Sequence, residues 1–439
     1  EISGVDLNND GTVDIVQHTN RSGAYSLTVI NNNGNGTLSI GQNLTNVFVV
    51  NAANTTTAAS MTWADFNGDG YMDLYLGSSY NNNGGVIYYN DGTGKLSATK
   101  SAVEASNAAA GYLSVAVDWN GDGQMDIIKL STYGGSQTAT LFTNNGYGST
   151  WTSSQLASGI AYATGVAAVD YNWDGAKDLL LLTGASGKRA ARLYRYKNGR
   201  MNLAGEAAMS AGIASVERME AGHITDGLPA VFAEEKMASG IGLTTDIFVY
   251  SDGMLVNLAL DGEDIASRST YRPVQVYAAD INSDGVIELP RAVLMAGYKD
   301  AAAHDALYML DWYAYGLGTT PVQVSTTYQC ISDAWSLRID RSWHDRITAV
   351  KSTDGGLSMV SFYEYRGAGQ SSIPLFNIYC VTGSSREYYA GRTDLIQLGQ
   401  TSQAVYFAKI PEGAQSGTLK IGAEEISSRF SIVKQAWNN

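Results

Sequence analysis

The sequence predicts an all-β protein, and three observations lead to this class. Short apolar segments, rich in Val, Ile, Leu and Tyr, recur along most of the chain. Turn-forming pairs such as N-G and D-G follow many of these segments. Helical periodicity is almost absent before residue 380. Many segments are apolar at nearly every position, so we expect both of their faces to be buried between stacked sheets.

A nine-residue pattern, D-x-N-x-D-G-x-x-[DE], occurs five times between such segments. Its copies are DLNNDGTVD (Asp6–Asp14), DFNGDGYMD (Asp65–Asp73), DWNGDGQMD (Asp118–Asp126), DYNWDGAKD (Asp170–Asp178) and DINSDGVIE (Asp280–Glu288). Oxygen-bearing side chains at positions 1, 3 and 5, a glycine at 6, a carbonyl at 7 and a carboxylate at 9 are typical of a calcium loop. One copy alone could be an Asx-rich turn, but five copies in register favour metal binding.

The pattern therefore predicts five Ca²⁺ sites, which lack the helices and the twelfth-position Glu of an EF-hand. At position 7 only the backbone carbonyl is expected to bind, since the residue there varies freely. The predicted ligands are Asp6, Asn8, Asp10, Thr12, Asp14, Asp65, Asn67, Asp69, Tyr71, Asp73, Asp118, Asn120, Asp122, Gln124, Asp126, Asp170, Asn172, Asp174, Ala176, Asp178, Asp280, Asn282, Asp284, Val286 and Glu288.

The spacing of the loops predicts the architecture. Their first aspartates stand at positions 6, 65, 118 and 170, a period of 52 to 59 residues, and the next stands two periods on, at 280. A repeat of this length with four short strands is typical of a β-propeller, and seven such units make a closed ring. The unit between keeps Asp226 in register but has Gly222, Ile224 and Ala230 at positions 1, 3 and 9, so we expect it to bind no calcium.

The seventh unit is expected at SLRIDRSWHDRITAV, between residues 336 and 350. Asp340 would occupy position 1 of its loop. Because His344 and Thr348 stand at positions 5 and 9, this loop too is expected to be free of metal.

These loops and their spacing resemble the FG-GAP/VCBS repeat family, which includes the amino-terminal propeller of integrin α subunits. The resemblance covers roughly residues 1–350, and the first four units are similar to repeats of bacterial surface adhesins. It implies that each loop joins the first two strands of a blade, that calcium lies on one face of the disc, and that a ligand binds the other. We expect a seven-bladed propeller of four-stranded blades over residues 1–380.

Residues 381–439 are expected to form a small α/β appendage that packs on the propeller or helps to close it. SSREYYAG predicts a short helix, and DLIQLGQT and QAVYFAKIP predict strands. In the last part, Leu419, Ala423, Ile426 and Phe430 would share one face of a helix.

Composition narrows the partners. The net charge of −14 and the pI of about 4.7 argue against nucleic acid, whose phosphates need a basic surface, and against an anionic membrane. The sequence has no apolar run long enough to insert into a bilayer. We expect a monomer outside the cell or on a bacterial surface, where calcium is abundant, with an upstream segment removed. Cys330 and Cys380 could form a disulfide or remain two buried thiols.

Catalytic patterns are hard to find. The histidines form no zinc motif; they are His18, His223, His304 and His344. The run GASGKRAARLYRYK (184–197) lacks the first glycine of a phosphate loop, and we expect a turn and a strand with Arg192 and Arg195 facing solvent. An anionic sugar or acidic partner could use this basic run. Most aromatic residues are expected to pack between blades, although Trp119 and Trp173 lie inside calcium loops.

We therefore expect a calcium-stabilised binding module that recognises a protein or glycan and is not an enzyme. One alternative is a polysaccharide lyase, which would need a Lys, Arg, Tyr or His cluster in a cleft at the disc centre. Another is a rigid spacer within a larger adhesin.

Overall fold

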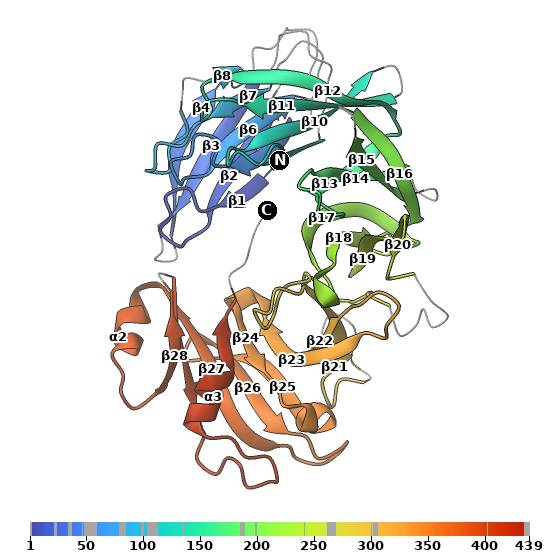
Figure 1. The fold of residues 1–439 in the computed structure, drawn as a ribbon. Coiled ribbons are helices and arrows are strands. Elements are labelled where there is room, and N and C mark those ends of the chain that lie inside the picture. The colour runs from blue at the N-terminus through green and yellow to red at the C-terminus, as the bar shows by residue number, and fades with distance from the viewer. Residues whose placement is uncertain are drawn as a thin grey trace.

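The computed structural model describes residues 2–21, 24–33, 37–45, 47, 59–78, 85–97, 101–102, 113–133, 136–184, 189–197, 200–240, 242–260, 269–299, 301, 306–401 and 403–433. These residues form seven sheets, and every strand pairing in them is antiparallel. The sheets follow one another around a central region (Figure 1). The all-β class predicted from the sequence is thus confirmed.

The first five sheets have four strands each, laid side by side in chain order. Their strands are β1 (Ile2–Val5), β2 (Asp14–Arg21), β3 (Ala24–Asn32) and β4 (Leu38–Thr45); β5 (Ala59–Ala64), β6 (Asp73–Ser78), β7 (Val86–Tyr88) and β8 (Ser101–Ala102); β9 (Leu113–Val117), β10 (Asp126–Tyr133), β11 (Ser136–Asn144) and β12 (Trp151–Ile160); β13 (Ala163–Val169), β14 (Asp178–Thr183), β15 (Ala190–Lys197) and β16 (Arg200–Ala208); β17 (Ile213–His223), β18 (Pro229–Met237), β19 (Leu243–Ser251) and β20 (Met254–Asn257).

The sixth and seventh sheets have five strands each and take in the end of the chain. The sixth runs β21 (Glu288–Leu294), β22 (Tyr308–Ala314), β23 (Val322–Cys330), β24 (Trp335–Arg338), β30 (Phe430–Ile432), and the seventh runs β25 (Ile347–Asp354), β26 (Leu357–Glu364), β27 (Ile373–Thr382), β29 (Ala404–Lys409), β28 (Ile396–Gln400). Two short α-helices, α2 (Arg386–Ala390) and α3 (Ala423–Arg429), and four 3₁₀ turns, η1 (Thr225–Gly227), η2 (Ile331–Asp333), η3 (Arg341–Arg346) and η4 (Gly383–Ser385), complete the described elements.

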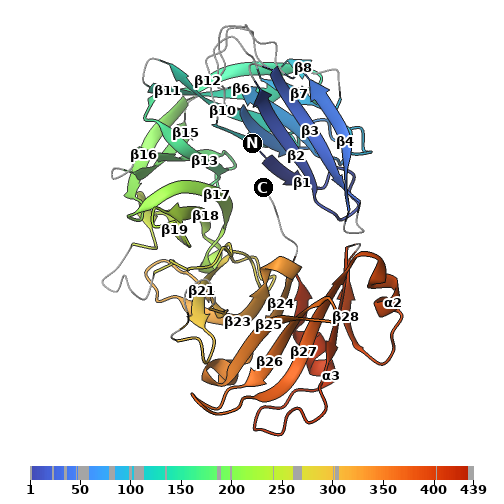
Figure 2. The ribbon, with the colours of Figure 1, turned by 180° about the vertical axis from the view of Figure 1, so that it is seen from behind.

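In the first five sheets, the first strand lies toward the centre and the fourth toward the outside. Seen from behind, β1, β13 and β17 border the central region while β4 and β16 lie at the periphery (Figure 2). The inner strands β5, β9, β13 and β17 contact one another in that order. Successive sheets therefore stand side by side like blades around an axis.

The hydrophobic core is divided into layers between neighbouring sheets. Strand β14 shows how, because all six of its residues are buried. Leu179 and Leu181 pack toward the third sheet, while Leu180 and Leu182 pack toward the fifth. Burial of a leucine side chain stabilises the folded state by about 1.5–3 kcal/mol. Because β14 buries leucines on both faces, it stabilises the packing of its own sheet against both neighbouring sheets. This agrees with the two-sided burial expected from the apolar runs.

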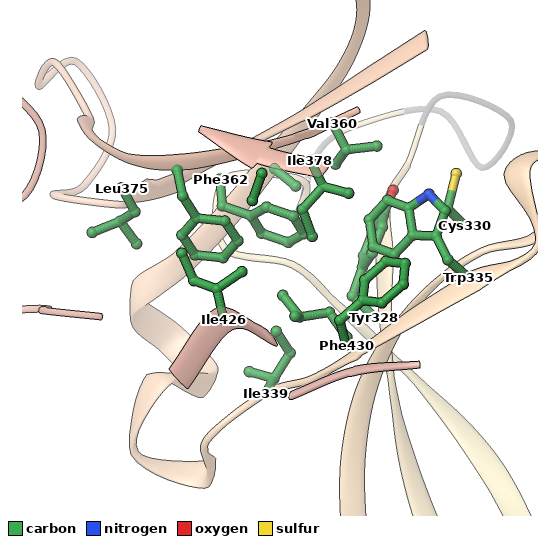
Figure 3. Packing of buried hydrophobic residues seen from close by; sticks show 14 of the residues in the cluster. Tyr328, Cys330, Trp335, Ile339, Val360, Phe362, Leu375, Ile378, Ile426 and Phe430 are labelled. Carbon is green, nitrogen blue, oxygen red and sulfur yellow. The ribbon is translucent and has the colours of Figure 1, made fainter. Parts of the chain in front are cut away.

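The end of the chain completes the layer between the sixth and seventh sheets. Ile426 of α3 and Phe430 of β30 lie among Tyr328, Trp335 and Phe362 (Figure 3). The Phe430 ring stacks on Trp335 with centroids 5.8 Å apart. The tail is thus part of this core. The predicted boundary at residue 380 falls inside β27, which pairs with β29 of the tail.

Two expectations from the repeat were wrong. The apolar segment 276–280, expected as the first strand of the sixth unit, pairs only through one isolated bridge, Ala279–Glu288. Asp340 was expected in a loop joining two strands of one sheet, but it precedes η3 in the link between β24 and β25, which belong to different sheets. The reason is that β24 pairs with β23 through a short hairpin and with the distant β30, so it belongs to the sixth sheet and does not begin the seventh.

The structure also answers the expectations about the two cysteines, the tail and membrane-spanning segments. Cys330 and Cys380 are two free, buried thiols. The tail forms the expected short helix and both strands, while its last helix covers only Ala423–Arg429, so Leu419 precedes it and Phe430 begins β30. No helix in the described ranges is long and apolar enough to cross a bilayer.

Candidate metal-binding loops

Each of the five nine-residue loops lies where the innermost segment of a sheet turns into the next strand. Four connect β1 to β2, β5 to β6, β9 to β10 and β13 to β14, and the fifth follows the Ala279–Glu288 bridge and enters β21. Neighbouring loops touch: the side-chain amide of Asn9 in the first donates to the Gly70 carbonyl in the second at 3.0 Å. The loops therefore share one end of the sheet arrangement.

Within a loop, the acidic side chains shape the turn by accepting backbone N–H groups. In the third loop, Asp118 accepts from Asp122 N at 3.1 Å and from Gly123 N at 3.0 Å. Asn120 Oδ1 also accepts from Asp122 N at 3.0 Å, and Asp122 Oδ1 accepts from Gln124 N at 2.8 Å. Such Asx turns curl the chain so that the remaining lone pairs at positions 1, 3 and 5 gather on one side.

The glycine at position 6 is required by backbone geometry. Its φ lies between +83° and +88° in all five loops, a region that favours glycine. Position 4 also has a positive φ, and it is occupied by Asn9, Gly68, Gly121, Trp173 and Ser283. The sequence pattern had treated position 4 as free, so this second constraint was missed; the two glycines and one asparagine there were the available signal.

The position-9 carboxylates are buried and hold each loop to its sheet. Asp73 accepts from Phe66 N at 3.0 Å and from Asn90 N at 2.8 Å, and Asp126 accepts from Trp119 N at 3.1 Å and Asn144 N at 2.8 Å. Burial raises the pKa of Asp73 to about 6 against these hydrogen bonds. A buried carboxylate whose ionised form is disfavoured gains from a nearby cation.

Burial acts in the same way on two other position-9 residues. It raises the pKa of Asp178 to about 6, although the Arg195 guanidinium opposes the shift. It raises the pKa of Glu288 to about 7, and the charges of Asp284 and Asp280 add to this.

Buried oxygen atoms without hydrogen-bond partners show whether these residues suit a divalent cation. In the fourth loop Asp170 Oδ1, Asn172 Oδ1 and Asp178 Oδ2 are buried and have no hydrogen-bond partner; in the fifth the same holds for Glu288 Oε1. They belong to positions 1, 3 and 9, the positions predicted to bind calcium. Hard oxygen ligands of this kind suit Ca²⁺, so the donor set fits the ion.

The side chains of the loops do not, however, converge into a complete metal-binding cluster. Across the described ranges, no three carboxylate, histidine or cysteine side chains converge as a group that could hold a metal ion. The Asn side-chain amide at position 3 donates to the carboxylate at position 5 in every loop, at 2.5 to 3.0 Å. The position-9 carboxylates of the first three loops are already bonded on both oxygens to backbone N–H groups. Metal binding by the predicted residues remains a prediction.

Asparagines at or just after the third strand link the second and third sheets to the loop of the preceding sheet. Asn90 Nδ2 donates to the Leu7 carbonyl in the first loop at 2.6 Å, and Asn144 Nδ2 donates to the Phe66 carbonyl in the second at 2.8 Å. Both asparagines also donate their backbone N–H to the buried carboxylate of their own loop, Asp73 and Asp126 respectively. A chain of hydrogen bonds thus connects three successive loops.

In the fourth sheet, an aromatic contact replaces the asparagine hydrogen bond to the preceding loop. Tyr196 takes the place of these asparagines in the fourth sheet, and its ring meets Trp119 of the third loop edge-on, with centroids 5.7 Å apart. The sequence shows these asparagines only within the turn-forming runs N-D-G and N-N-G, because the contact they make is with another repeat.

In the unit around Asp226, hydrophobic core residues occupy two of the ligand positions of the loop. Ile224 and Ala230 are fully buried and belong to the hydrophobic layer between the fifth and sixth sheets. At Gly222, a Cβ atom would lie 2.7 Å from Ile287 Cγ1, which is too close, so a ligand-bearing side chain does not fit. Asp226 keeps a left-handed φ of 66°.

The basic run and the aromatic residues can now be placed, except His304, Tyr80 and residues 185–188, which lie outside the described residues. Arg192 bonds to Glu206 at 2.8 Å, and Arg195 lies 3.6 Å from Asp174, so both arginines are ion-paired and only partly exposed. Trp119 is buried, whereas Trp173 is 67% exposed and stacks with His223.

Comparison with known proteins agrees with the repeat. Residues 6–76, 65–128 and 118–181 each match the FG-GAP-like repeat, so the amino-terminal part of this chain is built of FG-GAP-like repeats. A search of curated proteins gives no match.

Several solved structures share a distant likeness. A protein from Lactobacillus plantarum is 10% identical, with 85% of this chain and 94% of that chain covered and a TM-score of 0.37. Aleuria aurantia lectin in complex with α-methyl-L-fucoside is 12% identical, with 82% and 98% covered and a TM-score of 0.31. Bacillus licheniformis rhamnogalacturonan lyase is 10% identical, with 93% and 70% covered and a TM-score of 0.33. At such values the likeness carries no argument about activity.

Proposed function

We propose that this chain is an extracellular, calcium-stabilised, seven-bladed β-propeller that binds a protein or glycan ligand and catalyses no reaction. The observation that carries the proposal is the recurrence of one acidic loop at the same point of five sheets, with the first three loops hydrogen-bonded to one another through Asn90 and Asn144. Calcium would be structural, since the loops lie where the innermost segment of a sheet meets its next strand.

The charge balance supports a structural ion. Each loop carries three carboxylates, and those at position 9 are buried. In the absence of a cation, burial favours their neutral forms, as the raised pKa values of Asp73 and Glu288 indicate. A bound Ca²⁺ would favour the ionised forms, so ion binding and the folded state would stabilise each other.

One histidine-containing polar cluster lacks the geometry of a nucleophile relay. His344 Nε2 lies 2.9 Å from Asp311 Oδ1 and 3.2 Å from Thr326 Oγ1. A relay from carboxylate through histidine to a nucleophile needs the two ring nitrogens to face the two partners separately. Here one nitrogen faces both partners, and Thr326 donates to Asp311 directly at 2.6 Å.

Thermal unfolding with and without chelator tests the metal. EDTA should lower the melting temperature, and Ca²⁺ but not Mg²⁺ should restore it, because Mg²⁺ prefers a rigid octahedral shell that keeps water. A melting temperature that ignores EDTA would refute the role of calcium.

A glycan and protein binding screen of the calcium-loaded chain tests the second half of the proposal. Retention of a ligand without turnover is the expected outcome. Release of unsaturated sugar products would instead establish a lyase, and absence of any ligand would favour a spacer.

A further inference from the structure

A pocket of about 310 Å³ lies between β23, β24 and α3, and none of the residues that line it belongs to a calcium loop. Three arginines line it, Arg338, Arg341 and Arg429, against a single carboxylate, Asp340. On a chain with a net charge of −14, such a concentration of guanidinium groups is unusual. Local positive potential of this kind attracts an anionic ligand.

One of the three arginines is fixed. Arg429 bonds to Glu425 at 2.5 Å, lies 3.6 Å from Asp340, and stands 5.1 Å from the centre of the Trp343 ring. The other two are not compensated in this way: Arg338 and Arg341 are exposed, and neither takes part in an ion pair within the described ranges. They are free to meet a ligand at the mouth of the pocket.

The floor of the pocket is polar and ordered. Thr326 is 4% exposed, accepts from Gln323 Nε2 at 2.9 Å and donates to Asp311 at 2.6 Å. Ser325 stands beside it. Hydroxyl and amide groups suit the hydroxyls of a sugar ring, and the fork of an arginine suits a carboxylate.

We propose that this pocket binds a carboxylate-bearing saccharide, with Arg338 and Arg341 holding the carboxylate and with Gln323 and Ser325, rather than the fully bonded Thr326 hydroxyl, meeting the hydroxyls of the ring. The volume is at the lower end for ligand sites, so a single sugar unit is the expected occupant. The inference rests on the proposed binding function and names the class of its ligand.

The experiment compares D-glucuronate with D-glucose, which differ only in the carboxylate, by saturation-transfer NMR and calorimetry. Glucuronate should bind with a Kd of about 1 mM, more weakly as salt rises, and glucose should not bind measurably. The double variant Arg338→Gln/Arg341→Gln should lose at least about tenfold in affinity, whereas Arg192→Gln in the fourth sheet should lose none.

Equal binding of the two sugars, no binding of glucuronate, or full binding by the double variant would overturn this site. A chain that still melts in a calcium-dependent manner and retains another ligand in the screen would leave the proposed function standing without it.

A second observation concerns the fourth calcium loop alone. Arg195 on β15 points its guanidinium at the loop, with Nε 3.5 Å from Asp178 Oδ2 and Nη2 3.6 Å from Asp174 Oδ2. The Tyr250 ring lies 5.5 Å from the guanidinium carbon on the other side. Two of the three predicted carboxylate ligands of this loop therefore already face a positive charge.

No other loop has such a neighbour at this position. Leu179 pairs with Tyr194, so Arg195 stands opposite the position-9 acid one step along the ladder. By the same register the corresponding residues are Asn31, Tyr89, Thr143 and Ala314, none of which is basic.

We infer that Arg195 acts as a built-in cation for the fourth loop, which keeps its shape without metal and binds Ca²⁺ most weakly of the five. The inference rests on the proposed function and adds which loop binds calcium most weakly and which residue causes this. Calcium entering this loop would have to displace the guanidinium or tolerate its repulsion, and both weaken binding.

Arg195→Gln and the control Arg192→Gln, which removes an ion-paired arginine of the same strand, test this. Tb³⁺ luminescence excited through Trp173, in the loop itself, reports the fourth site, and Trp173→Phe identifies that signal. In Arg195→Gln the affinity at this site should rise about tenfold or more. Its melting temperature in EDTA should fall below that of Arg192→Gln, because Asp174 and Asp178 lose their counter-charge.

Unchanged affinity at the Trp173 site, or equal melting of the two variants in EDTA, would overturn the inference. The EDTA comparison needs no metal, so it decides the role of Arg195 even if none of the loops binds calcium and the proposed function fails.

Discussion

The latch between sheets makes a quantitative prediction at Asn144, which is fully buried. Its Nδ2 donates to the Phe66 carbonyl of the preceding sheet at 2.8 Å, and its Oδ1 accepts from Gly148 N at 2.8 Å. Asn144→Ala removes both bonds and leaves two buried groups without partners. A hydrogen bond contributes about 1 kcal/mol net, and an unsatisfied buried group costs about 1–3 kcal/mol. With two such groups, we expect the free energy of unfolding to fall by about 2–6 kcal/mol.

Urea unfolding of Asn144→Ala beside Asn145→Ala checks this. Asn145 is the adjacent, exposed residue; its Nδ2 donates to Thr143 O at 3.1 Å and Thr152 Oγ1 at 2.9 Å. Its loss should cost about 0.5 kcal/mol or less, as surface substitutions do. Because the backbone N–H of Asn144 still reaches Asp126, the difference between the variants should persist in calcium and in EDTA. Equal losses at the two positions would show that the latch does not hold the sheets together.

Three further predictions concern charge and thiols. Asp118→Asn should reduce the rise in melting temperature that calcium produces, while Asp226→Asn, in the unit without ligands, should leave it unchanged. Burial, with a nearby acidic charge, raises the pKa of Glu235 to about 10, so its neutral form is favoured in the fold and stability falls as pH rises between the unfolded and folded values, roughly from pH 4.5 to 10. Glu235→Gln should therefore gain stability relative to the parent as pH rises, by at most about 1.4 kcal/mol per pH unit, measured by urea unfolding at pH 6 and 9. Cys330 and Cys380 should react with a thiol reagent only after unfolding, and a reductant should not shift the melting temperature; prompt reaction of the native chain would contradict their burial.

Much of the fold could be predicted from local sequence patterns. The loops are shaped by side chains that accept hydrogen bonds from backbone N–H groups within five residues, as Asp118 does from Gly123. They can therefore be recognised without the rest of the chain. The four consecutive leucines of β14 likewise indicate burial on both faces.

What the sequence hid is what depends on distant partners. Asp340 looked like the start of a seventh loop, but β24 before it pairs with β30, almost at the end of the described chain. Arg195 looked like a solvent-facing base, and only the register of β14 against β15 places it beside Asp178. The asparagine latches are contacts between repeats, so no single repeat contains the information.

The pairing of β24 with β30 also bears on synthesis. Leu337 leaves the ribosome long before its partner Phe430 does, so the sixth sheet presents an unmatched edge while the intervening segments are being translated. The five upstream sheets pair strands that follow one another in the sequence and can assemble as they emerge, whereas the sixth sheet is completed only after β30 has been translated. A chain truncated between β27 and β30 would leave one edge of β24 unpaired, and an exposed strand edge favours aggregation.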